Sequence, residues 1–198
     1  MKHMIFVLLL LVLTLFGCDT GNGSGTSDLP VSTVRWELGR DGFIQFYTND
    51  SRYYDYSFRV LYENSNGIGV YEIECKKISG YQNQAYGMIF GASDINTFYC
   101  INISASGAWY IWKQDGEAFT EIKDWDYSDK LYTGHNKINS IKVTKSSSTY
   151  TVFLNDSQVY QFDDTSITGN RVGYYVSVGS ETNEAFPNTP VDVRFRQK

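Results

Sequence analysis

Histidine, cysteine and proline are scarce in this chain of 198 residues, which holds two, three and three of them. One histidine, His3, lies at the extreme N-terminus, which argues against a zinc site built from clustered histidines. A Ser-His-Asp triad could use only His135. Basic residues are also few, since 17 Lys and Arg against 22 Asp and Glu give a net charge of −5. Nucleic acid requires a clustered basic surface, so we expect no nucleic-acid partner.

A long apolar run is absent except near the N-terminus, where Met4–Leu13 follows Lys2. This run is shorter than the ~20 residues that a membrane-spanning helix needs, and it fits a secretory signal. Its end, Leu15-Phe16-Gly17-Cys18, resembles a bacterial lipobox, although Phe16 replaces the usual small residue. The resemblance implies that Cys18 is lipidated and that the signal peptide is residues 1–17.

The residues after Cys18 are rich in Gly, Ser and Thr and have almost nothing to bury. Such a composition is typical of a flexible tether, here residues 18–30. Stable anchoring takes at least two acyl chains, which a modified lipoprotein cysteine carries. We therefore expect a domain of residues 31–198 held at the bacterial cell envelope, with the membrane as its partner through Cys18.

Helical periodicity is also missing beyond residue 34, and alternation of apolar and polar residues takes its place. Val70–Ile78 puts Tyr71, Ile73 and Cys75 on one face, whereas Ala85–Phe90 is apolar on both. We predict further strands at 43–47, 57–62, 97–103, 109–112, 119–122, 140–144, 150–154, 158–162, 171–178 and 191–195. Roughly eleven to thirteen strands with short links cannot stay in one flat sheet. The predicted fold is all-β, a two-sheet antiparallel jelly-roll sandwich.

Two cysteines, Cys75 and Cys100, lie inside predicted strands. Export makes a disulfide between them possible. Two buried thiols are the alternative, and the sequence leaves the choice open because pairing depends on the distance between the Cα atoms.

The order of these elements resembles the concanavalin A-like lectin/glucanase jelly-roll superfamily, which includes laminin-G-like domains. The resemblance runs from about Tyr71 to Arg196 and implies the fold but no single activity. The segments that carry it are 71–74, 86–90, 94–99, 106–110, 115–116, 124–128, 139–143, 154–156 and 169–173.

Laminarinase-like glycosidases of this superfamily place three carboxylates on one strand face, and retaining hydrolysis needs two of them about 5 Å apart. Glu72 and Glu74 are the nearest match here, but Lys76 and Lys77 occupy the positions of a third carboxylate. A solvated strand face of mixed charge is therefore the favoured interpretation. Keto-disaccharide hydrolases also occur in the superfamily, and no residue carries over as their catalytic group.

Oxygen-bearing side chains alternate in the segment of Asp124, Asp126 and Asp129, like the start of a calcium loop. The sixth and twelfth positions are Asp129 and His135, so it is not an EF-hand. A calcium site is the only cofactor that the sequence suggests, and a polar loop whose Trp125 packs on the sheet edge is the favoured alternative.

Aromatic residues are abundant, with 16 Tyr, 12 Phe and 4 Trp. Sugars stack on aromatic rings while amides and carboxylates bind their hydroxyls, which makes Trp109, Trp112, Trp125, Tyr127 and Asn102 candidate ligand-binding residues. Trp109 and Trp112 have opposite parity on one strand, so at most one faces the inter-sheet core. Core packing is the general alternative for any one ring, but some are expected to form an exposed patch.

Three functions remain open at this stage. The favoured one is a non-catalytic module of a membrane-anchored lipoprotein that binds carbohydrate or another surface ligand. The second is a carbohydrate-active hydrolase, of the laminarinase-like or the keto-disaccharide hydrolase type. The third is a structural envelope lipoprotein that acts through protein partners.

Overall fold

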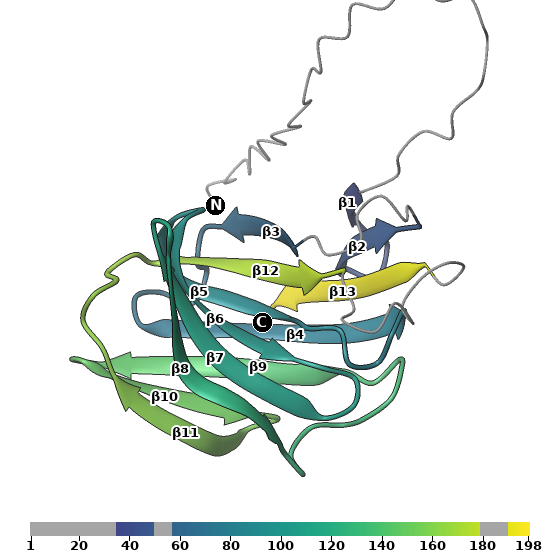
Figure 1. The fold of residues 1–198 in the computed structure, drawn as a ribbon. Helices are drawn as coiled ribbons and strands as arrows, with labels where there is room; N and C mark the ends of the chain where they lie inside the picture. The colour runs from purple at the N-terminus through teal and green to yellow at the C-terminus, as the bar shows by residue number, and fades with distance from the viewer. Residues whose placement is uncertain (1–34, 50–56, 179–189) are drawn as a thin grey trace, which may run out of the picture. The chain divides into compact units, whose positions relative to one another are not determined.

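The computed structural model describes residues 35–49, 57–178 and 190–198. The predicted signal peptide, tether and lipidated Cys18 lie outside these residues. The described residues form two antiparallel sheets and no helix, as predicted for an all-β jelly-roll sandwich (Figure 1). Accordingly, no helix long and apolar enough to cross a membrane is found in these ranges.

One sheet has seven strands, in which β13 and β4 lie between the consecutive pair β1–β2 and the consecutive run β9–β10–β11. From edge to edge they are β1 (Arg35–Leu38), β2 (Ile44–Thr48), β13 (Val191–Gln197), β4 (Val70–Ser79), β9 (Asn139–Ser146), β10 (Thr149–Leu154) and β11 (Ser157–Asp163).

The other sheet has six strands, and it carries the site described below. From edge to edge they are β3 (Ser57–Tyr62), β12 (Arg171–Ser177), β5 (Tyr86–Asp94), β6 (Thr97–Ile103), β7 (Ala108–Asp115) and β8 (Ala118–Tyr127).

The main core lies between the sheets and is rich in aromatic rings. Tyr174 of β12 stacks on Phe195 of β13 with ring centroids 4.7 Å apart. Phe90 and Tyr99 stack in the same way at 5.3 Å. Rings that bury 150–250 Å² each explain how so many aromatic residues are accommodated, because they fill the space between two sheets.

A second buried cluster covers the opposite face of the six-stranded sheet. On β6 the residues alternate, so that Tyr99 and Ile101 belong to the core, whereas Phe98 and Cys100 belong to this outer cluster. The outer cluster consists of Ile89, Ala92, Phe98, Cys100, Trp112 and Tyr175. The six-stranded sheet therefore has apolar residues on both faces.

Positive φ angles occur at three of the turns that join the strands. Gly107 (φ 94°) follows β6 and Gly116 (φ 61°) joins β7 to β8. Asn155 and Asp156 both have positive φ between β10 and β11, as a type I′ hairpin turn requires.

Two features differ from the sequence-based expectation, and a third decides the cysteine pairing that the sequence left open. β1 was not predicted, because Arg35–Leu38 shows no clear alternation and is mostly exposed. β8 extends to Tyr127, so Asp124 and Asp126 belong to a strand and not to a loop. Cys75 lies in the inter-sheet core and Cys100 in the outer cluster of the other sheet, and both are free thiols. The sheet that separates them prevents a disulfide.

Candidate functional site

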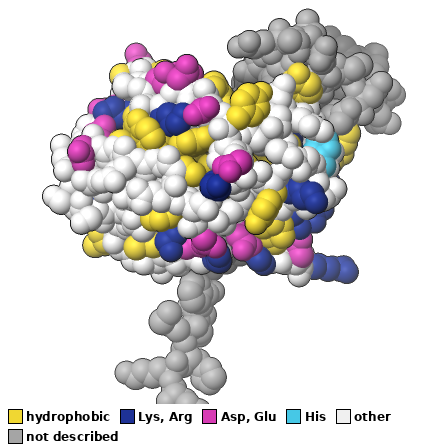
Figure 2. Space-filling view, turned by 90° about the horizontal axis from the view of Figure 1, so that it is seen from below, with side chains coloured by type: hydrophobic (Ala, Val, Ile, Leu, Met, Phe, Trp, Pro, Cys, Tyr) yellow, Lys and Arg dark blue, Asp and Glu magenta, His cyan; other side chains and the backbone are white. Residues whose placement is uncertain are grey.

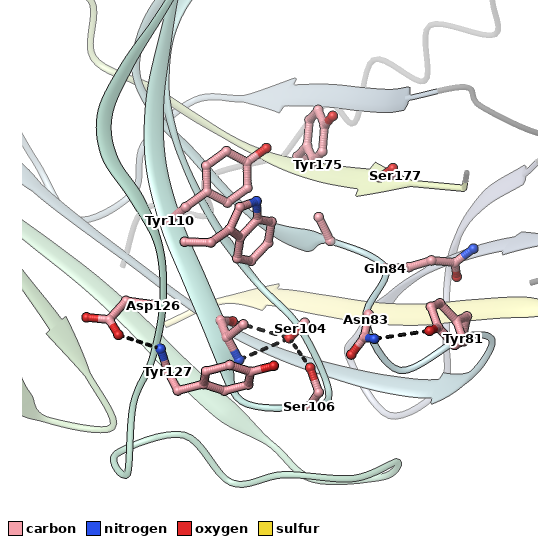
Figure 3. A pocket seen from close by; sticks show the side chains of 13 residues that line it. Tyr81, Asn83, Gln84, Ser104, Ser106, Tyr110, Asp126, Tyr127, Tyr175 and Ser177 are labelled. Atoms are coloured by element: carbon pink, nitrogen blue, oxygen red, sulfur yellow. Dashed lines mark hydrogen bonds between the residues drawn. The ribbon is translucent and has the colours of Figure 1, made fainter. Parts of the chain in front are cut away.

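A cavity of about 530 Å³ opens on the outer face of the six-stranded sheet, within the ~300–1,000 Å³ typical of ligand sites (Figure 3). It lies where the β4–β5 connection, the β6–β7 turn, the end of β12 and the second half of β8 meet. We call it the outer pocket. Its lining residues are Tyr81, Asn83, Gln84, Ala85, Ser104, Ser106, Ala108, Tyr110, Trp125, Asp126, Tyr127, Tyr175 and Ser177.

Strand register explains why these residues meet. Tyr175 pairs with Gly87, Gly87 with Asn102, and Asn102 with Tyr110, so the two tyrosines stand on one row across four strands. Three inter-strand spacings separate them by about 14 Å. Gly87 has no side chain, so nothing projects from the sheet in the middle of this row. A larger residue does not fit there, because a Cβ atom would lie 1.9 Å from the carbonyl oxygen of Ile101. The result is a hollow between two aromatic side chains.

The wall on the β8 side is aromatic. The ring of Trp125 packs against the ring of Tyr110, with centroids 4.1 Å apart. Trp125 remains 44% exposed and Tyr127 74% exposed. Aromatic surface left open beside a cavity is suited to stacking on the flat apolar side of a ligand.

Polar groups of the pocket are held by fixed hydrogen bonds. The buried Asn102 donates from Nδ2 to the hydroxyl oxygen of Tyr110 at 3.0 Å, and Asn83 donates in the same way to Tyr81 at 3.1 Å. The hydroxyls of Tyr175 and Ser57 lie 2.6 Å apart. Burial raises the pKa of Tyr110 and of Tyr175, so both phenols are protonated at neutral pH.

The connection that carries Tyr81 is anchored from inside the protein by Lys77. This lysine occupies an inward position of β4 and is 1% exposed. Its Nζ atom donates to the carbonyl oxygens of Tyr81 (2.6 Å) and Gln84 (3.1 Å). Gln84 in turn donates to the carbonyl oxygen of Val178, just beyond β12. These hydrogen bonds link the β4–β5 connection to β4 of the seven-stranded sheet and to the end of β12 in the six-stranded sheet.

Formal charge is nearly absent from the pocket. Among the described lining residues, only Asp126 is charged at neutral pH. Figure 3 shows its carboxylate pointing away from the other labelled side chains. That carboxylate accepts the backbone N–H of Tyr127 and lies 3.4 Å from Nζ of Lys123. The other described lining side chains are phenols, hydroxyls, amides, an indole and two alanine methyl groups.

The structure separates the five ligand-binding candidates. Trp125 and Tyr127 line the outer pocket, and Asn102 lies beneath it, bonded to Tyr110. Trp109 is buried in the inter-sheet core against Tyr160. Trp112 is buried in the outer cluster beside Tyr175 and does not line the pocket. The predicted opposite orientation of the two tryptophans is confirmed, and neither presents a ring to the pocket.

Glu72 and Glu74 lie on the outer face of the seven-stranded sheet, away from the pocket. Glu72 forms ion pairs with Lys142 (3.4 Å) and Lys198 (3.2 Å). Glu74 accepts a hydrogen bond from Nε of Arg196 at 2.7 Å. Lys142 and Arg196 are the direct cross-strand neighbours of these carboxylates. The arrangement is the mixed-charge strand face that the sequence favoured.

The aspartates of the calcium hypothesis are engaged with neighbouring groups. Asp124 accepts the backbone N–H of Trp125 at 2.6 Å, and Asp129 pairs with Lys130 at 2.8 Å. In the described ranges, no group of three or more His, Cys, Asp or Glu side chains is placed to hold a metal ion. Figure 2 shows acidic and basic side chains interspersed on one face of the molecule, with hydrophobic groups between them.

Sequence reasoning missed Tyr81, Tyr110 and Tyr175. Tyr110 and Trp112 are two residues apart on β7, so their side chains point to the same, outer face of the sheet. This spacing is the signal in the sequence that could have identified Tyr110. For Tyr175 and Tyr81 no local signal existed, because their place in the pocket depends on β12 and on the β4–β5 connection coming next to β7 and β8.

No family model matches the chain, and no curated protein does. Solved structures do match. The carbohydrate-binding module CBM66 from Bacillus subtilis aligns with a TM-score of 0.56 at 17% identity, over 81% of this chain and 88% of that one. A Bacillus licheniformis beta-glucanase gives a TM-score of 0.55 at 10% identity, over 88% of each chain. A glycoside hydrolase family 16 endo-glucanase from Bacteroides ovatus gives 0.57 at 11%, over 83% and 85%.

The two antiparallel sheets of seven and six strands define the class of protein, a jelly-roll sandwich. The structural matches share this fold, the two-sheet jelly roll that the resemblance stated from the sequence implied.

Proposed function

We propose that the outer pocket binds carbohydrate and that the domain is a non-catalytic glycan-binding module. The observation that carries the proposal is the composition of the pocket, in which the exposed rings of Trp125 and Tyr127 stand beside phenol, serine and amide groups. An aromatic platform with a few oriented hydrogen-bonding groups suits a sugar, which has an apolar ring face and a rim of hydroxyls. One of the structural neighbours is a carbohydrate-binding module and two are glucanases, which supports the same ligand class.

A glycan array followed by titration calorimetry tests this function. We expect micromolar binding to at least one glycan and a loss of more than tenfold in affinity in Trp125→Ala. Phe119→Ala is the matched control, since Phe119 is an exposed aromatic residue of the same strand that does not line the pocket. Equal losses in both variants, or no binding to any glycan, contradict the proposal.

We further propose that the mature chain begins at a lipidated Cys18 and is held at the bacterial cell envelope. The support is the lipobox-like Leu15-Phe16-Gly17-Cys18 after an apolar run, followed by the Gly/Ser/Thr-rich tether. Mass spectrometry of the N-terminal peptide should show acyl chains on Cys18, and Cys18→Ala should move the protein out of the membrane fraction. An unmodified N-terminus would refute lipidation and leave the glycan-binding proposal standing.

A further inference from the structure

Two tyrosine hydroxyls of the outer pocket share an unusual environment. Each accepts a hydrogen bond from an asparagine side chain, Tyr110 from Asn102 and Tyr81 from Asn83. The tyrosines come from β7 and from the β4–β5 connection, which are different parts of the pocket lining (Figure 3).

Donor and acceptor counts show what these hydroxyls can still do. A phenol carries one O–H donor, and an asparagine amide that donates to its oxygen leaves that proton unused. Asn102 has no second orientation that serves equally well, because its Oδ1 atom is the acceptor for the thiol of Cys100 at 3.3 Å. The chain of bonds runs from Cys100 to Asn102 to Tyr110, and it ends on the Tyr110 O–H, which has no acceptor among the described residues. Asn83 likewise donates to the hydroxyl oxygen of Tyr81, so that the Tyr81 O–H can donate to a ligand.

Among the lining residues that the structure describes, no side chain offers a cation to an anionic ligand group. The one charged residue of this described lining, Asp126, directs its carboxylate away from the other labelled side chains, and its counterion Lys123 is not among the lining residues. An anionic group placed between Tyr110 and Tyr81 would lose its water shell without gaining a cation, which is costly.

Building on the proposed glycan-binding function, we propose that the outer pocket selects uncharged glycans, and that Tyr110 and Tyr81, oriented by Asn102 and Asn83, donate hydrogen bonds to ligand oxygens. Asn102 and Asn83 are positioning residues, since they act through the tyrosines. Neutral sugar oxygens accept such bonds, and a carboxylate or sulfate lacks the cation that it needs.

Ligand selectivity is tested with the neutral oligosaccharide that binds best on the array and the same oligosaccharide oxidised at C6 to uronates. We expect the oxidised form to bind the wild-type protein at least tenfold more weakly. Equal binding of the two forms overturns the selectivity. Binding of neither form is a failure of the proposed function itself, so the two results are distinguishable.

The donor role is tested by a double-mutant cycle. Tyr110→Phe removes only the hydroxyl, and we expect about a 2- to 12-fold loss of affinity, the range of one neutral hydrogen bond. Asn102→Asp replaces the donor by an acceptor, which draws the Tyr110 proton away from the ligand. Asn102→Asp should therefore weaken binding as much as Tyr110→Phe, and it should add nothing in the Tyr110→Phe background.

Because Asn102 is fully buried, Asn102→Asp can fail to fold, and the exposed pair provides the second cycle. Asn83→Asp and Tyr81→Phe should show the same non-additive loss at a position where folding is not at risk. Wild-type affinity in both Tyr110→Phe and Tyr81→Phe, or fully additive losses in the second cycle, overturn the donor role.

Discussion

The Nζ atom of Lys77 lies 2.6 Å from the carbonyl oxygen of Tyr81, so a buried cation of the seven-stranded sheet holds a residue that lines the pocket of the six-stranded sheet. The Nζ atom of Lys77 also donates to the backbone carbonyl oxygen and to the side-chain oxygen of Gln84. Burial lowers the pKa of Lys77 to about 7, because these oxygens are dipoles and not countercharges.

This pKa predicts how stability varies with pH. Between pH 7 and the unfolded value near 10.5, the folded chain binds fewer protons than the unfolded chain, so stability rises with pH. From pH 7 to 8.5 the rise should be about 2 kcal/mol, and it should be absent in Lys77→Met. Denaturant unfolding at both pH values measures it. Lys137→Met, which removes an exposed lysine, should keep the rise, and a rise that survives in Lys77→Met would refute the assignment.

The ion pair and hydrogen bonds of Asp164 predict that the folded domain loses stability in acid. Burial opposes its ionisation, but hydrogen bonds from Lys113 (2.6 Å) and from Ser166 outweigh burial and hold the pKa of the carboxyl well below its usual range. This contribution is full above about pH 4 and is lost as pH falls through the folded pKa. Asp164→Ala should cost about 2 kcal/mol at pH 7 and less at pH 2. Equal costs at the two pH values would contradict the prediction.

Gly87→Ala should be among the most damaging single-methyl additions to this domain. The added Cβ would lie 1.9 Å from the carbonyl oxygen of Ile101, a backbone atom that cannot rotate away. We expect a loss of at least about 2 kcal/mol in unfolding free energy, or failure to fold. Ala92→Gly, at another buried position of β5, should cost only about 1 kcal/mol, as expected for glycine in a strand. A stable Gly87→Ala protein would show that the strands can separate there.

Glu74→Gln should leave glycan affinity within twofold of the wild type, because Glu74 lies on the sheet that does not form the pocket. Its ion pair with Arg196 is partly exposed, so the cost in stability should stay below about 1 kcal/mol. Calorimetry and denaturant unfolding on one preparation measure both. A large loss of binding would make the outer face of the seven-stranded sheet part of the ligand site.

The thiols of Cys75 and Cys100 should not react in the folded domain. Both are fully buried, and burial raises the pKa of each, so thiolate is scarce at neutral pH. In Cys18→Ala, a thiol reagent should label neither cysteine under native conditions and both in denaturant. Fast labelling of Cys100 in the folded state would mean that the outer cluster opens.

Much of this fold was predictable because its strands alternate clearly. Ser57–Tyr62 and Thr97–Ile103 were predicted with their exact bounds. β8 was predicted too short, because its edge position leaves most residues exposed and blurs the alternation. Trp125 and Tyr127 were identified as candidates by residue type alone. That argument also selected Trp109, which is buried in the inter-sheet core and contacts Tyr160 of the opposite sheet, a contact that no local pattern encodes.

Among the described strands, β8 pairs with β7 alone and lies at the edge of its sheet. Trp125 and Tyr127 therefore sit on an edge strand, whose backbone bonds to a single neighbouring strand. β8 can open locally while the aromatic core between the sheets stays intact, so the backbone amides of β8 should exchange quickly in the ligand-free domain. A ligand that bridges β8 to Tyr175 should slow that exchange, and the protected amides would map where the bound molecule lies.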